Sequence, residues 1–114
     1  MILSYDIDNT LTNHPELAEI ASAMQAMGHR NIVLTGRKTD AGIKELLHSI
    51  KFPEDVEIIT KANDKTTTRA FKERVLREQA VDLHFDDGLD LPALHPTKVV
   101  TFRQSNVRFG RFTR

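Results

Sequence analysis

The chain has 114 residues, with 39% hydrophobic and 28% charged side chains, a balance typical of one folded globular domain. Sixteen basic and sixteen acidic side chains cancel, so no overall charge drives the chain toward nucleic acid or a membrane. The absence of cysteine excludes disulfides, iron–sulfur clusters and thiol catalysis, and it fits a reducing, cytoplasmic location. The N-terminal segment carries Asp6, unlike a signal peptide, and no apolar run approaches the roughly 18 residues of a membrane span.

Five short apolar runs predict β-strands. Each run is bounded by Gly, Pro, Asp or Asn and is too short for a typical helix. Their apolar residues are nearly continuous rather than alternating, which is typical of parallel strands that are covered on both faces. The expected strands are residues 1–5, 31–34, 56–59, 81–85 and 98–102.

Helical periodicity fills the segments between these runs. The expected helices are residues 17–27, ended by Gly28; residues 43–50, capped by Thr39; and residues 70–76, capped by Asn63 and Asp64. The connection 87–95 has room for about two further turns. Alternating strands and helices predict an α/β fold, a three-layer Rossmann-like domain with a central parallel sheet of about five strands over residues 1–102.

The C-terminal arm, residues 103–114, is locally basic. Four arginines, Arg103, Arg108, Arg111 and Arg114, occur without an acidic residue and are interleaved with phenylalanines. This pattern favours an arm of the same domain that packs its rings on the domain itself or on a second subunit, so a homo-oligomer is left open. Contact with nucleic acid is the alternative, because basic and aromatic residues together bind phosphates and bases.

Acidic, hydroxyl and basic residues follow the predicted strands. They are Asp6, Asp8, Asn9 and Thr10; Thr35, Gly36 and Arg37; Lys61 and Lys65; and Asp86, Asp87 and Asp90. Ligands of parallel sheets bind where the strands end, so these side chains are expected at one edge. Clustered carboxylates need a cation, and oxygen ligands without Cys or His favour a hard ion, Mg²⁺. A phosphate would complete such a site, with Thr35 and Lys65 on its other oxygens.

Four of these segments resemble the motifs of the haloacid dehalogenase (HAD) superfamily of phosphotransferases. Asp6-x-Asp8-x-Thr10 after an apolar strand resembles the first motif, and Ile32–Arg37, with Thr35 at the strand end, resembles the second. Lys65 resembles the lysine of the third motif, and Leu83–Asp87 with Asp90 resembles the acidic fourth. The resemblance covers residues 6–90 in the family's order and implies a HAD-like domain.

The resemblance also implies a role for each matched residue. Asp6 corresponds to the nucleophile that forms an aspartyl-phosphate, and Asp8 to the general acid and base. Thr10, Thr35, Gly36 and Lys65 correspond to phosphate-binding positions. Asp6, Asp8 (through its backbone carbonyl), Asp86 and Asp87 correspond to ligands of Mg²⁺. Asn9, Arg37 and Asp90 take supporting or substrate-contacting places, with a structural ion pair as the alternative for Arg37.

Two points of the match stay open. Asn9 stands where many relatives have Gly, and Asn also accepts unusual turn dihedrals. Lys61 competes with Lys65 for the third motif, and Lys65 is preferred because it follows Asn63 and Asp64, a plausible helix cap.

The segments between the motifs leave no room for the cap domains that select substrates in this superfamily. The chain therefore resembles a minimal, capless phosphatase that hydrolyses phosphomonoesters on a large substrate, such as a nucleotide or a nucleic-acid end. The form of the second and fourth motifs is similar to the 3′-phosphatase domain of polynucleotide kinases.

Two rival interpretations belong to other functional classes. A response-regulator receiver domain has similar size and chemistry, but its acidic pair follows the first strand, whereas the pair Asp86–Asp87 follows the fourth. A catalytically silent binding or assembly protein that retains the fold is the second, and the intact pair Asp6 and Asp8 weakens it.

Overall fold

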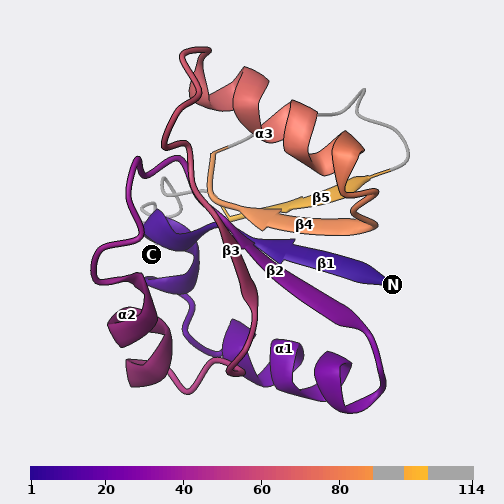
Figure 1. Cartoon of the computed structure of the whole chain (residues 1–114). Coiled ribbons are helices and arrows are strands. Elements are labelled where there is room, and N and C mark those ends of the chain that lie inside the picture. Colours follow the sequence, from indigo (N-terminus) through magenta and orange to yellow (C-terminus); the bar gives the residue numbers. More distant parts are fainter. Residues whose placement is uncertain (89–96, 103–114) are drawn as a thin grey trace, which may run out of the picture.

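A five-stranded sheet lies at the centre of the computed structural model, which describes residues 1–88 and 97–102 (Figure 1). Its strand order is β3-β2-β1-β4-β5, and every neighbouring pair is parallel. The strands are β1 (Ile2–Tyr5), β2 (Arg30–Leu34), β3 (Glu57–Ile59), β4 (Leu83–Asp86) and β5 (Lys98–Thr101). This topology confirms the expected Rossmann-like α/β fold.

Helices cover both faces of the sheet (Figure 1). The helices α1 (Leu17–Ala26) and α2 (Ile43–Ser49) pack on one face, and α3 (Thr68–Glu78) packs on the other. The strands are therefore buried on both sides, which explains why their sequences are apolar almost without alternation. No described helix is long and apolar enough to cross a membrane.

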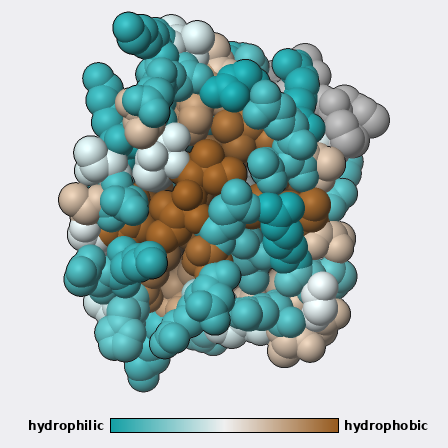
Figure 2. Space-filling model, in the orientation of Figure 1, coloured by the Kyte–Doolittle hydropathy of each residue, from teal (hydrophilic) through white to brown (hydrophobic). Residues whose placement is uncertain are grey.

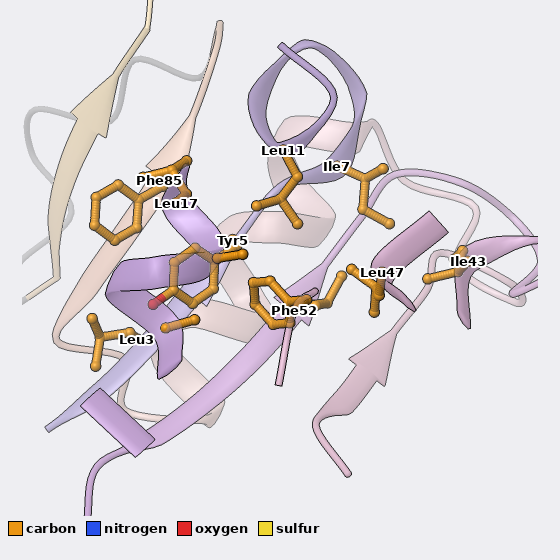
Figure 3. Close-up of a cluster of buried hydrophobic side chains, with 12 residues drawn as sticks. Leu3, Tyr5, Ile7, Leu11, Leu17, Ile43, Leu47, Phe52 and Phe85 are labelled. Carbon is orange, nitrogen blue, oxygen red and sulfur yellow. The ribbon is translucent and has the colours of Figure 1, made fainter. Parts of the chain in front are cut away.

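Aromatic rings fill the core beneath α1 and α2 (Figure 3). Tyr5 and Phe85 are register partners on β1 and β4, and their rings stack with centroids 5.1 Å apart. The ring of Phe52 meets that of Tyr5 edge-on at 5.2 Å. Phe102, after β5, extends the stack from Phe85, and His14 lies against Phe102 with centroids 4.4 Å apart. The rings thus join three strands and the loop that follows β1 into one packed row.

The face under α3 has a different composition. Phe71, Val75 and Leu76 of α3 pack on Ile32 and Leu34 of β2. Beside this apolar cluster, the side chains of the alternate residues of β1 and β4 are polar and fully buried or nearly so: Ser4, Asp6, His84 and Asp86. Because side chains alternate between faces along a strand, these polar residues are on the face opposite Tyr5 and Phe85.

Two helices have other N-caps than the sequence predicts. Gly42, with φ of 76°, precedes α2, so Thr39 is not its cap, although the Thr39 hydroxyl accepts a bond from the Ala41 N–H. The cap of α3 is Thr67, whose side chain accepts from the Ala70 N–H. Asp64 does not cap α3, because its carboxylate is bonded by the N–H of Thr66. The further helix expected within residues 87–95 and the arm 103–114 lie outside the described residues, apart from Asp87 and Gly88.

Candidate functional site

Three carboxylates gather where β1 and β4 end. The Asp6 N–H donates to the Phe85 carbonyl at 2.9 Å, which holds the two strand ends together. Carboxylate oxygens of Asp6, Asp86 and Asp87 all lie within 4.8 Å of one another, with the first two residues buried and Asp87 partly buried. An oxygen-only donor set of this size and charge fits a hard divalent cation such as Mg²⁺.

A buried lysine from α3 bridges two of these carboxylates. Lys72 Nζ lies 3.0 Å from Asp6 Oδ1 and 2.8 Å from Asp86 Oδ2, and the Lys72 side chain is only 6% exposed. Burial alone would lower the pKa of Lys72, but the charges of Asp6 and Asp86 outweigh it and raise the pKa. The ammonium therefore stays charged and offsets part of the negative charge of the cluster.

The pKa values of Asp6 and Asp86 are shifted in opposite directions. Burial raises the pKa of Asp6 to about 7, although the charge of Lys72 works against this rise. Burial also acts on Asp86, but the hydrogen bond from His84 and the charge of Lys72 outweigh it and hold the pKa of Asp86 well below its usual range. Asp86 is thus a permanent anion, whereas the ionisation of Asp6 is sensitive to its surroundings near neutral pH.

A histidine and a serine, two positions earlier on β4 and β1, form a hydrogen-bond chain to Asp86. His84 is fully buried, its Nε2 lies 3.0 Å from Asp86 Oδ2, and its Nδ1 lies 2.7 Å from Ser4 Oγ. Burial lowers the pKa of His84, which favours the neutral ring. Because an ionised carboxylate only accepts hydrogen bonds, Nε2 carries the proton and Nδ1 accepts from the Ser4 hydroxyl.

Asp8 pairs with Arg37 and is not one of the clustered carboxylates. After β1 the chain turns through Ile7–Leu11, where Asn9 adopts a positive φ of 63°, in line with its expected tolerance. Asp8 is exposed and forms a bidentate ion pair with Arg37, whose Nη2 and Nε lie 2.8 and 3.1 Å from its two oxygens. The hydrogen bond from Arg37 lowers the pKa of Asp8. The Asp8 side chain is therefore not among the three clustered carboxylates. The expected metal contact of Asp8, through its backbone carbonyl, stays a prediction.

Hydroxyl groups and a glycine complete this edge of the sheet. Thr10 is buried and its hydroxyl donates to Asp6 Oδ2 at 3.3 Å. Thr35 is buried at the end of β2, and its hydroxyl accepts from the Arg37 N–H at 3.1 Å. Gly36 is closely packed, since a Cβ at this position would lie 2.8 Å from Thr68 Cγ2 at the start of α3.

The structure places a lysine other than the predicted Lys65 beside the carboxylates. Lys65 is exposed in the loop before α3, and Lys61 Nζ donates to the Asp64 carbonyl. The ammonium beside Asp6 and Asp86 belongs to Lys72 instead. Lys72 lies among the buried residues of α3, next to Phe71 and three positions before Val75, so a charged residue within an apolar helical stripe was the available signal. Asp90 lies outside the described residues.

Ser4 and His84 were also missed as site residues. Each is a polar residue inside an otherwise apolar strand sequence and stands two positions before an aspartate, Asp6 or Asp86. That shared spacing was the signal, because residues two apart in a strand lie on the same face.

A hollow of about 560 Å³ lies away from this site, between α2 and β3. Leu47, Phe52, Val56 and Ile58 contribute its apolar lining. Figure 2, drawn in the orientation of Figure 1, shows apolar side chains across its middle. In this region β3 is the edge strand of the sheet. The residues lining this hollow do not include any of the three clustered carboxylates, so it is separate from the candidate site.

Comparison with known proteins supports the fold. No protein-family model matches the chain, and no curated protein matches it significantly. A chain of the solved structure described as "Structure of Pnkp1/Rnl/Hen1 complex" is similar, with a TM-score of 0.60 and 18% sequence identity. The match covers 75% of this chain and 38% of that chain. At this level of identity the similarity shows a shared fold.

Proposed function

We propose that this chain is a Mg²⁺-dependent phosphomonoester hydrolase with Asp6 as its nucleophile. The observation that carries the proposal is the cluster of Asp6, Asp86 and Asp87 with Lys72 buried against it. Burying several charges where the strands end costs stability. Buried carboxylates whose pKa values are shifted in this way are typical of functional sites. The resemblance to the HAD motifs assigns the three aspartates, but not Lys72, to phosphoryl transfer.

The proposed first step is nucleophilic substitution at phosphorus. An oxygen of Asp6 forms a bond to phosphorus while the bond to the leaving oxygen breaks, and the leaving oxygen takes a proton from Asp8. Water then attacks phosphorus, Asp8 accepts a proton from that water, and inorganic phosphate leaves with Asp6 regenerated. A bound Mg²⁺, held by Asp6, Asp86, Asp87 and the Asp8 carbonyl, would supply the positive charge that lets two anions approach.

Lys72, Thr35 and Arg37 have supporting roles in this proposal. Lys72 keeps Asp6 oriented and balances charge as the phosphoryl group arrives. The Thr35 hydroxyl lies at the end of β2, with the Gly36 backbone beside it, where phosphate oxygens are expected. Arg37 now holds Asp8 ionised, so proton donation by Asp8 requires Arg37 to exchange that carboxylate for another anion. The substrate phosphate is the anion that arrives there.

We propose a nucleotide or nucleic-acid end as the substrate. The segments between the motifs are too short for an inserted cap domain. The site is therefore open to a large substrate. The similar solved chain belongs to the structure titled "Structure of Pnkp1/Rnl/Hen1 complex". The resemblance of the second and fourth motifs to 3′-phosphatase domains supports a nucleic-acid end as the substrate. Contact of the basic arm 103–114 with such a substrate remains part of this proposal, as does packing of the arm on a second subunit.

The test is release of phosphate from 3′- and 5′-phosphorylated oligonucleotides, nucleotides and an aryl phosphate, with Mg²⁺ and with EDTA. We expect turnover with Mg²⁺, loss of turnover in EDTA, and one phosphoryl group trapped on the intact chain by rapid acid quench. Asp6→Asn should abolish both turnover and trapping. Asp55→Asn is the matched control, because Asp55 is exposed before β3, at the opposite edge of the sheet, and its positive φ suits Asn. Full turnover by Asp6→Asn would exclude Asp6 as the nucleophile.

A further inference from the structure

The candidate site has a second polar layer beneath its carboxylates. Ser4 and His84 are Cα partners on β1 and β4, two positions before Asp6 and Asp86. All four side chains are on the α3 face of the sheet, and Ser4 and His84 have no exposed surface. The layer therefore lies directly behind the cluster, between the carboxylates and the amino ends of the two strands.

Every polar atom of the Ser4–His84 pair is occupied. The Ser4 hydroxyl donates to His84 Nδ1 at 2.7 Å, and His84 Nε2 donates to Asp86 Oδ2 at 3.0 Å. A buried imidazole costs stability unless it is bonded in this way, and a Val at the same strand position would pack without any such requirement. Packing alone therefore gives no reason for a histidine here.

The pair fixes the orientation of the Asp86 carboxylate. Asp86 Oδ2 accepts from His84 Nε2 and from Lys72 Nζ, and Oδ1 accepts from the Gly88 N–H at 3.1 Å. Lys72 is shared with Asp6, so it does not determine the rotation of Asp86 by itself. His84 supplies a second donor to the same oxygen, and Ser4 fixes which ring nitrogen carries the proton.

A second donor to Asp86 matters for a cation. Lys72 and a divalent cation are both positive and compete for the same carboxylates. The bond from His84 Nε2 holds Asp86 independently of Lys72. If His84 lost its donor, the carboxylate could rotate toward Lys72, and the ion pair would then tighten at the expense of the cation.

We propose that His84, oriented by Ser4, is a positioning residue that holds Asp86 for a divalent cation and so sets the affinity of the site for that cation. The inference deepens the proposed function and rests on it for the identity of the site. It assigns the pair a role in cation binding, separate from the bond-making steps.

The test measures cation binding without substrate, by the electron paramagnetic resonance signal of free Mn²⁺ and by Mg²⁺ calorimetry. We expect His84→Leu to weaken Mn²⁺ binding about tenfold, the size of effect typical when a bond to a metal-ligating residue is removed. His84→Gln, whose amide nitrogen can replace Nε2, should retain affinity within about threefold, and Ser4→Ala should fall between the two. With substrate, the Mg²⁺ concentration at half-maximal rate should rise while kcat at saturating Mg²⁺ changes little.

Val33→Ala is the matched control for lost stability. Val33 is buried in β2 on the Tyr5 face of the sheet, away from His84. It should lower the melting temperature and leave Mn²⁺ affinity unchanged. Should His84→Leu fail to fold, Ser4→Ala and His84→Gln carry the test.

Wild-type Mn²⁺ affinity in His84→Leu, or in Ser4→Ala where His84→Leu does not fold, overturns the positioning role. The proposed function fails separately, if the wild-type chain binds Mn²⁺ but releases no phosphate from any substrate. A wild-type chain that binds no divalent cation overturns both.

Discussion

The two faces of the central sheet are built from alternate residues of the same strands, yet they are chemically opposite. Toward α1 and α2, β1 and β4 present Tyr5 and Phe85, whose rings stack in an apolar core. Toward α3, the neighbouring positions present Asp6 and Asp86, which Lys72 bridges. His84, on the same face, bonds Asp86. One face can thus stabilise the fold by burial while the other carries charges that burial disfavours.

The largest effect should follow from removing the charge that balances the polar face. Lys72→Met leaves Asp6 and Asp86 buried without their shared cation, and breaking a buried ion pair in this way costs about 3–5 kcal/mol of unfolding free energy. Turnover of a phosphomonoester should be lost as well. Urea unfolding with and without Mg²⁺ measures the first effect, and Mg²⁺ should restore part of the stability. An unchanged midpoint without Mg²⁺ would show that Lys72 does not balance these carboxylates.

The apolar face should respond in stability alone. Phe52→Ala removes the ring that packs edge-on against Tyr5, and such truncations of buried aromatic residues cost about 3 kcal/mol or more. The affinity of the folded protein for Mn²⁺ should not change, since Phe52 is on the face opposite the carboxylates. A parallel loss of cation affinity would mean that the two faces are coupled more closely than their alternation implies.

Asp6→Asn should stabilise the cation-free protein near pH 8. Burial raises the pKa of Asp6 to about 7, above its ordinary value near 4. The folded chain therefore binds more protons than the unfolded chain between these values, so the contribution of Asp6 to stability falls as the pH rises through that window. The substitution removes this cost, and we expect a gain of about 1 kcal/mol at pH 8 that disappears toward pH 4. Melting temperatures measured across this range in EDTA give the comparison, and a gain that grows toward acid would have the wrong sign.

The smallest effect concerns how closely α3 approaches the sheet edge. Gly36→Ala places a methyl group 2.8 Å from Thr68 Cγ2, and we expect a loss of about 1 kcal/mol as the start of α3 shifts. Thr68→Ala removes the opposing methyl group, so the double variant should regain most of that loss. Additive losses in the double-mutant cycle would show that the two positions do not meet.

The strands, the parallel sheet and the gathering of carboxylates where β1 and β4 end follow from the sequence, because short apolar runs and the rule for parallel sheets depend on local composition. The strand order within the sheet was not predicted. The lysine does not follow, since two cap signals compete before α3. Asp64 and Thr67 both suit a helix start, and Asp64 instead bonds the Thr66 N–H, so α3 begins four residues after Asp64. Lys65 therefore stays in the loop before α3, and Lys72, in the second turn of α3, reaches Asp6 and Asp86.

The direction of Asp8 was equally hard to predict. Two aspartates at spacing two share a face only while the strand continues, and here β1 ends at Tyr5. The positive φ of Asn9 and the ion pair with Arg37 then fix Asp8 in solvent. The tolerance of Asn9 for a positive φ is local and was expected, and an ion pair was one alternative for Arg37. The partner of Arg37 was not predictable, because the pair joins residues from two strand ends that no single window of the sequence contains.

Tyr5 gives the protein a single optical reporter. The chain has one tyrosine and no tryptophan, and the Tyr5 hydroxyl is buried and donates to Asn31 Oδ1 at 2.9 Å. Burial raises the pKa of Tyr5 far above that of a free phenol. The ultraviolet absorbance of tyrosinate should therefore not develop at the alkaline pH where an exposed tyrosine ionises, but only as the chain unfolds. Absorbance during an alkaline titration would follow the opening of β1, immediately beside Asp6.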